Sequence, residues 1–201
     1  MNYDVDINEI ANYNTHSADL KLASTALIII EMQNSFKGDI ISDRQINNVR
    51  KLINFSDDNH MLKIFVQHDD NATFSYNMID WWGGDKIEKY SDAWEIMDEF
   101  KADAKTIVHK NQYSAFHNTN LNELLKQNKI SDVIICGVMT NCCCETTARD
   151  AFMHGYNVVF AHDATGTINA DLHLAAIKNI AFGFASVLNT ECVCRLGINS
   201  N

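Results

Sequence analysis

The chain has 201 residues, of which 46% are hydrophobic, 21% charged and 9% aromatic. This composition is typical of a folded soluble domain and excludes a disordered or fibrous protein. The formal net charge of −10 makes nucleic acid and anionic membrane surfaces unfavourable partners, so we expect neither.

The six cysteines indicate a reducing compartment rather than a disulfide framework. Three of them, Cys142, Cys143 and Cys144, are consecutive and badly placed for separate disulfides. The first residues are acidic, unlike a signal peptide, and no apolar run approaches the roughly 20 residues that cross a bilayer. We therefore expect a cytoplasmic protein without a membrane anchor.

Residues 1–24 are polar and rich in asparagine, and we interpret them as an irregular arm on a single domain that spans residues 1–201. After the arm, short apolar runs alternate with amphipathic stretches. The runs predict strands at residues 26–30, 62–67, 106–109, 133–136, 157–161 and 185–188. The amphipathic stretches predict helices at residues 44–58, 91–101, 120–128, 142–154 and 169–182.

This alternation predicts an α/β protein of three layers, α/β/α, with a central, mostly parallel, six-stranded sheet of Rossmann type. The connection over residues 69–90 is long, holds Trp81 and Trp82, and could overhang a pocket. Tryptophans in such a loop can equally anchor it to the body of the domain. Near the C-terminus, Cys192 and Cys194 flank Val193 in a run that we interpret as a strand with packing thiols.

Ligands of open parallel sheets bind beyond the carboxyl ends of the strands. The residues that follow the predicted strands are therefore candidates for a site, namely Glu31, His68, Lys110, the segment 137–143 and Asp163. An acid, a base and a thiol are thereby expected on one rim of the sheet.

Cys143 lies just inside the start of a predicted helix, where unpaired N–H groups and the helix dipole favour negative charge. We expect this position, beside a lysine, to lower the thiol pKa below about 8.5 and to favour the nucleophilic thiolate. A cysteine on a helix that faces a sheet is also commonly a small buried hydrophobe, and we interpret Cys142 and Cys144 in that way.

Three segments share a pattern, in order, at predicted strand ends. Residues 25–36 read TALIIIEMQNSF, residues 110–121 read KNQYSAFHNTNL, and residues 136–151 read CGVMTNCCCETTARDA. They resemble, respectively, the first strand with its D-M-Q-N-x-F turn, the K-x-x-Y-S-A-F…T-x-L block and the nucleophile block of the isochorismatase-like cysteine hydrolases. That superfamily includes nicotinamidases and carbamoylsarcosine amidohydrolase, and the resemblance extends over about residues 25–163.

The resemblance implies a catalytic triad of Glu31, Lys110 and Cys143, in which the carboxylate takes the thiol proton and later gives it to the leaving amine. It also implies a cis peptide at Val138–Met139 and an oxyanion hole formed by the N–H groups of Met139 and Cys143. The first triad position is usually aspartate in this family, and Glu31 reaches one methylene further.

Side chains that we expect at the substrate are Trp81, Trp82, Tyr113 and His117, because aromatic walls suit a planar amide or aryl group. The nicotinamidase metal pattern, Asp-x-His, is not reproduced in the stretch of residues 66–70 (VQHDD). His68 with the adjacent Asp69 could bind a cation, yet two neighbouring side chains seldom form a tight site. We expect no cofactor and no required metal.

The sequence thus predicts a cysteine hydrolase that cleaves a small-molecule amide-type C–N bond through a Cys143 thioester. One alternative is hydrolysis of a vinyl ether, the isochorismatase reaction, which Cys143 disfavours because true isochorismatases lack this nucleophile. The other alternative is a non-catalytic, thiol-bearing member of the family. The resemblance also implies a homo-oligomer, either a dimer or a tetramer.

Overall fold

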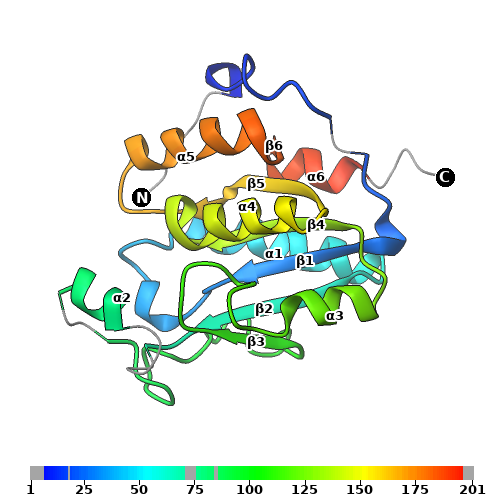
Figure 1. Cartoon of the computed structure of the whole chain (residues 1–201). Coiled ribbons are helices and arrows are strands. Elements are labelled where there is room, and N and C mark those ends of the chain that lie inside the picture. The colour runs from blue at the N-terminus through cyan, green and yellow to red at the C-terminus, as the bar shows by residue number, and fades with distance from the viewer. Residues whose placement is uncertain (1–6, 18, 71–75, 84–85, 197–201) are drawn as a thin grey trace.

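The computed structural model describes residues 7–17, 19–70, 76–83 and 86–196. At its centre is one sheet in which every strand pairing is parallel, in the order β3-β2-β1-β4-β5-β6 (Figure 1). The strands are β1 Thr25–Ile30, β2 Leu62–His68, β3 Ile107–Lys110, β4 Asp132–Val138, β5 Asn157–Gly166 and β6 Ser186–Leu188.

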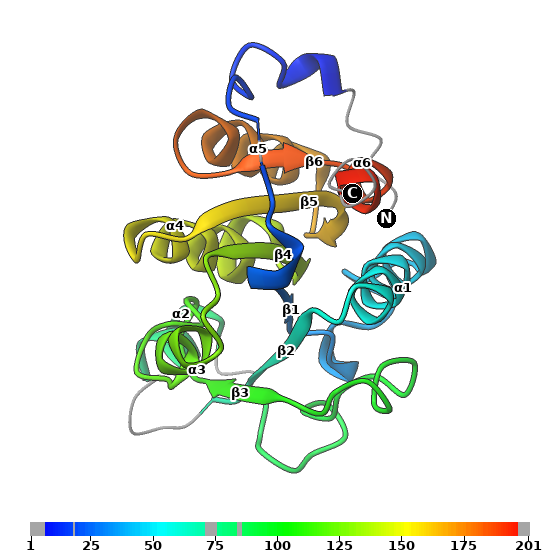
Figure 2. The ribbon, with the colours of Figure 1, turned by 90° about the vertical axis from the view of Figure 1, so that its right-hand side faces the viewer.

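Helices cover both faces of the sheet, with α1 and α6 on one side and α3, α4 and α5 on the other (Figure 2). Their bounds are α1 Asp43–Asp58, α2 Tyr76–Trp81, α3 Leu121–Gln127, α4 Glu145–Met153, α5 Ala170–Gly183 and α6 Thr190–Leu196. The predicted three-layer fold with a parallel sheet is confirmed. No helix among the described residues is long and apolar enough to cross a membrane.

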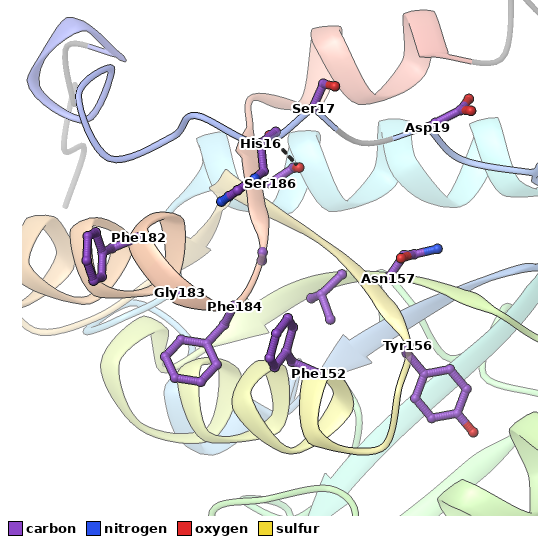
Figure 3. Close-up of a pocket in the computed structure, with 12 residues that line it drawn as sticks. His16, Ser17, Asp19, Phe152, Tyr156, Asn157, Phe182, Gly183, Phe184 and Ser186 are labelled. Atoms are coloured by element: carbon purple, nitrogen blue, oxygen red, sulfur yellow. Dashed lines mark hydrogen bonds between the residues drawn. The ribbon is translucent and has the colours of Figure 1, made fainter.

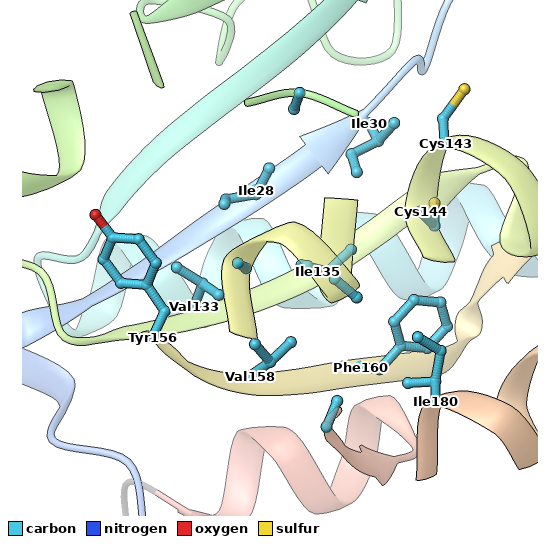
Figure 4. Packing of buried hydrophobic residues seen from close by; sticks show 14 of the residues in the cluster. Ile28, Ile30, Val133, Ile135, Cys143, Cys144, Tyr156, Val158, Phe160 and Ile180 are labelled. Atoms are coloured by element: carbon cyan, nitrogen blue, oxygen red, sulfur yellow. The ribbon is translucent and has the colours of Figure 1, made fainter. Parts of the chain in front are cut away.

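The six predicted strands are all present. β1 and β4 are buried along their whole length, whereas the edge strand β3 alternates between exposed and buried residues. Successive residues of a strand point to opposite sides, so the central strands contribute to two cores. Ile28 and Ile135 pack on the side of α4 and α5 (Figure 4), whereas Leu27 and Ile134 pack on the other side. β4 and β5 run further than predicted, since they keep pairing as far as Val138 and Gly166.

The predicted helix at residues 91–101 is wrong, because this segment forms turns. Its internal backbone hydrogen bonds are short turns, such as that from the Trp94 N–H to the Ser91 carbonyl at 3.1 Å, and other backbone groups bond to distant parts of the chain. The Glu95 carbonyl accepts from the Asn34 N–H at 3.0 Å, and the Trp94 carbonyl accepts from the side-chain amides of Gln33 and Gln67, each at 2.8 Å. Tertiary hydrogen bonds therefore override a helical pattern of apolar residues.

The predicted strand around Val193 is also wrong, because this run lies in α6. The side chain of Asn189 accepts from the Cys192 N–H at 2.7 Å, and Asp163 accepts from the Thr190 N–H at 2.7 Å. These two side chains satisfy N–H groups at the start of the helix, as caps do. Asp163 thus serves the helix rather than the rim of the sheet.

The described part of the N-terminal arm lies along the edge of the sheet. The Asn14 side chain donates to the Val187 carbonyl at 2.7 Å and accepts from the Val187 N–H at 3.0 Å. Asn14 thereby pairs with the outer edge of β6 as a neighbouring strand would. Ile10, in the same arm, is fully buried in the core. The assignment of the whole chain to a single domain stays a prediction.

Candidate active site

The strand order reverses between β1 and β4, which are neighbours in the sheet although far apart in the chain. Crevices at such a reversal are where open α/β sheets bind ligands. Glu31 follows β1 directly, Lys110 ends β3, and Cys143 follows β4. The sheet therefore brings the three predicted triad residues to one place.

Lys110 lies at the centre of this group, and its side chain has no exposed surface. Its ammonium forms an ion pair with the Glu31 carboxylate and lies 3.4 Å from Cys143 Sγ. It also donates to the Gln112 carbonyl at 2.8 Å. Burial alone would lower the pKa of Lys110, but the charges of Cys143, when it is ionised, and of Glu31 raise it above its usual value. The site therefore holds a charged ammonium.

Close approach of two chain segments positions the carboxylate. Glu31 has a φ of 50°, a left-handed conformation that costs a non-glycine residue about 1–2 kcal/mol and that clusters at functional sites. Opposite it, Gly137 has a φ of 114°, and a Cβ there would lie 2.0 Å from the Ile30 carbonyl oxygen. Only glycine lets β4 approach the end of β1 this closely.

Cys143 lies in a single π-helical turn, Thr140–Cys144, that leads into α4. Turns of this kind are rare in proteins, and those that occur are frequently at functional sites. Its sulfur points away from the packed core, whereas the side chain of Cys144 lies over the sheet (Figure 4). The peptide bond at Val138–Met139 is cis, which confirms that prediction.

The expectation of a lowered thiol pKa is wrong. Burial raises the pKa of Cys143 well above its usual value, and the charge of Glu31 raises it further, while Lys110 opposes both. The neighbouring carboxylate already neutralises the lysine, so the resting site favours Glu31 carboxylate, Lys110 ammonium and a protonated thiol. The Glu31 carboxylate, whose charge acts directly on the thiol, is the candidate base for its proton.

A cavity of about 430 Å³ opens over this group. Glu31, His68 and Cys143 line it, with Lys110 buried behind them. Of the four predicted substrate residues, the structure places Trp82 and Tyr113 in the wall, where the Trp82 indole donates to the Tyr113 hydroxyl at 3.2 Å.

Trp81 and His117 are not brought to the cavity. The side chain of Trp81, the last residue of α2, is 80% exposed, whereas that of Trp82, the next residue, is 45% exposed and lines the cavity. His117 is exposed and hydrogen-bonds with the neighbouring Asn118. Neither residue lines the cavity.

Met139, expected at the oxyanion hole, also lines the cavity. Other lining residues were not proposed from the sequence, and most are apolar: Ser35, Phe36, Ile40, Asp70, Met78, Lys86, Ile87, Ala93 and Ile168. Ser35 and Phe36 lie inside the first family-like block, which could have nominated them. The others lie outside the blocks, where only the folded chain shows that they meet.

His68 pairs with Asp70 rather than with the adjacent Asp69. Its Nε2 lies 3.0 Å from Asp70 Oδ1, and its Nδ1 lies 3.4 Å from Lys110 Nζ. A cation ligated by Nδ1 would face the ammonium, so these side chains do not fit a metal centre. Among the described residues there is no group of three or more His, Cys, Asp and Glu that could hold a metal ion.

A second hollow, of about 440 Å³, lies between the N-terminal arm and the C-terminal ends of α4 and α5 (Figure 3). Phe152, Phe182 and Phe184 contribute much of its wall, and it lies by the start of β5. It is thus at the amino end of the sheet. Equal size does not distinguish the two hollows, but the buried acid, base and thiol occur in the first.

Comparison with known proteins agrees with this geometry. Residues 25–192 match the family model described as the isochorismatase domain. Nicotinamidase 3 of Arabidopsis thaliana is 37% identical over 183 residues, which cover 89% of this chain and 91% of the relative. A ureidoacrylate amidohydrolase of Agrobacterium fabrum is 27% identical, with 86% and 90% covered.

Among solved structures, a cysteine hydrolase from Pseudomonas syringae pv. phaseolicola has the same fold, with a TM-score of 0.83 and 24% identity. The match covers 90% of this chain and 95% of that structure. The family model spans most of the chain, and it includes every residue of the buried group. The chain therefore belongs to the isochorismatase family.

Proposed function

We propose that this protein is a cysteine amidase that hydrolyses a small, non-peptide C–N bond through a thioester on Cys143. The observation that supports this most strongly is the Cys143 sulfur, 3.4 Å from a lysine ammonium that is itself paired with Glu31, at the floor of a cavity. The names of two relatives, a nicotinamidase and a ureidoacrylate amidohydrolase, agree with amide substrates.

In the proposed reaction, Glu31 takes the thiol proton as sulfur forms a bond to the substrate carbonyl carbon. The adduct collapses, the C–N bond breaks, and Glu31 gives the proton to the leaving nitrogen. Water then attacks the thioester while Glu31 takes one of its protons. The C–S bond breaks, the carboxylic acid leaves, and the sulfur regains a proton from Glu31.

Two further groups have proposed roles in this scheme. Lys110 keeps its positive charge beside the sulfur and stabilises the negative charge that develops there. The N–H groups of Met139 and Cys143 hold the oxyanion of the tetrahedral adduct; losing one donor of this kind costs about 10²–10³ in kcat in well-studied hydrolases. Trp82 and Tyr113 form the wall against which the acyl part of the substrate packs.

Ammonia or amine release from a panel of small amides and ureas, nicotinamide included, tests the proposal. Cys143→Ala should abolish release. Cys142→Ala is the matched control, since Cys142 is the adjacent thiol and does not line the cavity, and it should keep most of the activity. Equal loss in both variants, or activity retained by Cys143→Ala, would contradict a thioester mechanism.

The same variants address the vinyl ether alternative. The wild-type protein should not hydrolyse isochorismate, as measured by the release of its products. If this activity is present and survives Cys143→Ala, the protein is an isochorismatase in activity as well as in family.

The cytoplasmic location and the assembly into a dimer or tetramer stay predictions. Light scattering on the purified protein measures the oligomeric state.

A further inference from the structure

A chain of hydrogen bonds runs from Lys110 to a loop over the cavity. Lys110 Nζ lies 3.4 Å from His68 Nδ1, and His68 Nε2 lies 3.0 Å from Asp70 Oδ1. Asp70 Oδ2 accepts from the Ile87 N–H at 2.9 Å. The side chains of His68 and Asp70 are only 6% and 9% exposed, so water does not substitute for these partners.

The donors and acceptors in this chain determine the tautomer of His68. An ammonium has donors only, so the hydrogen bond between these two atoms requires His68 Nδ1 to accept, without a proton of its own. The proton of a neutral ring is then on Nε2, where it faces the Asp70 carboxylate. Although burial alone would raise the pKa of Asp70, its hydrogen bonds with His68 and the Ile87 N–H lower it overall, so Asp70 stays an acceptor.

Asp70 also fixes the loop. Its backbone N–H donates to the Ile87 carbonyl at 3.0 Å, while its side chain accepts from the Ile87 N–H, so the two residues form a two-bond bracket. Asp70 and Ile87 lie on either side of α2 and Trp82, and both line the cavity. One carboxylate therefore holds the base of this loop and the imidazole that faces the lysine.

We propose that Asp70 and His68 are positioning residues for Lys110, which rests on the function proposed above. Asp70 holds His68 in its Nε2–H tautomer, and the Nδ1 lone pair then directs the ammonium to its place between Glu31 and Cys143. The attachment of the loop at Ile87 and the position of the Lys110 ammonium thus both depend on the Asp70 side chain.

Asp70→Asn tests the tautomer directly. The new amide oxygen can still accept from the Ile87 N–H, which turns the NH₂ group towards His68 Nε2. That nitrogen must then accept, so the ring proton moves to Nδ1 and faces the Lys110 ammonium, donor against donor. We expect kcat to fall about 10- to 100-fold, the range for one lost hydrogen bond to a buried charge, with KM changed less than twofold.

His68→Asn provides the rescue. The Asn oxygen occupies nearly the position of Nδ1 and still accepts from Lys110, so kcat should fall less than threefold. Without an imidazole, Asp70→Asn has no tautomer to reverse, so adding it to His68→Asn should cost little more. Asp69→Asn is the matched control: it removes the adjacent carboxylate, which does not line the cavity, and should leave kcat unchanged.

Two readouts do not need turnover. Nitrogen NMR of the histidine rings should show His68, identified by its loss in His68→Asn, as the Nε2–H tautomer in the wild-type protein and as Nδ1–H in Asp70→Asn. Iodoacetamide labelling of Cys143 should slow in Asp70→Asn, because the displaced ammonium no longer favours the thiolate.

An Nδ1–H tautomer in the wild-type protein, or Asp70→Asn with wild-type kcat and labelling rate, would overturn the proposal. These outcomes are distinct from a failure of the proposed function. If the wild-type protein hydrolyses no amide, the tautomer and the labelling rate still decide whether Asp70 and His68 position the lysine.

Discussion

Glu31→Gln should produce a more reactive Cys143 and an inactive enzyme. In the wild-type site the carboxylate neutralises the Lys110 ammonium, and the pair is almost completely buried, so the thiol keeps its proton. Glutamine removes the carboxylate charge, and a Cys143 thiolate becomes the anion that can neutralise the lysine. The same change removes the base that the proposed reaction needs.

The size of both effects follows from general values. Removing one charge next to an ionisable group shifts its pKa by about 1–3 units. Each unit raises the thiolate fraction about tenfold, while the nucleophilicity of the thiolate falls about threefold, for a net gain of roughly 3- to 4-fold. Labelling should accelerate by roughly 3- to 60-fold at neutral pH, and loss of the base should lower kcat by about 10²–10⁴.

The assay measures iodoacetamide labelling of the Cys143 peptide by mass spectrometry over a range of pH, beside amide hydrolysis. Glu31→Asp, which keeps the charge, is the matched control and should label at the wild-type rate. Slower or unchanged labelling in Glu31→Gln would refute the charge balance inferred for the site. Hydrolysis that survives the substitution would refute the role of Glu31 as the base.

Three other outcomes are expected. Gly137→Ala should lower the free energy of unfolding, measured in urea, by about 3 kcal/mol or more, because its Cβ meets the Ile30 carbonyl. Gly155 also has a positive φ, but a Cβ there has nothing within 4 Å. Gly155→Ala is therefore the control and should cost only about 1 kcal/mol. Burial lowers the pKa of His173 to about 4, so the native state excludes a proton that the unfolded chain binds below about pH 6.5. The free energy of unfolding of the wild-type protein should therefore fall by about 2 kcal/mol between neutral pH and about pH 5. The fall should be smaller in His173→Gln. Trp82→Ala should raise KM about tenfold with a smaller effect on kcat, since it removes part of the cavity wall; unchanged KM would place the substrate elsewhere.

The sheet could be predicted from the sequence because its strands are continuous apolar runs. Residues 26–30 and β4 are buried on both faces, which is the pattern expected of strands in a parallel sheet covered by helices. Prediction failed where distant groups decide the local structure. Residues 91–101 have helical spacing, yet their carbonyls accept hydrogen bonds from the chain after β1, which no local pattern shows.

The candidate site was predictable in its members but less so in its electrostatics. Glu31 and Cys143 follow strands and Lys110 ends one, each in a matched block, and the sheet brings them together. The thiol pKa was predicted in the wrong direction because burial and the second charge depend on the folded site. The pairing of His68 with Asp70 had a usable signal, since residues two apart in an extended chain point to the same side.

The thioester on Cys143 is the central claim, and acid-quenched mass spectrometry during turnover tests it most directly. With the amide from the panel that is hydrolysed fastest, a fraction of the protein should gain the mass of the acyl group. The modified peptide should contain Cys143, and hydroxylamine should remove the adduct. Continued hydrolysis by Cys143→Ala, or an adduct on another cysteine, would contradict the account.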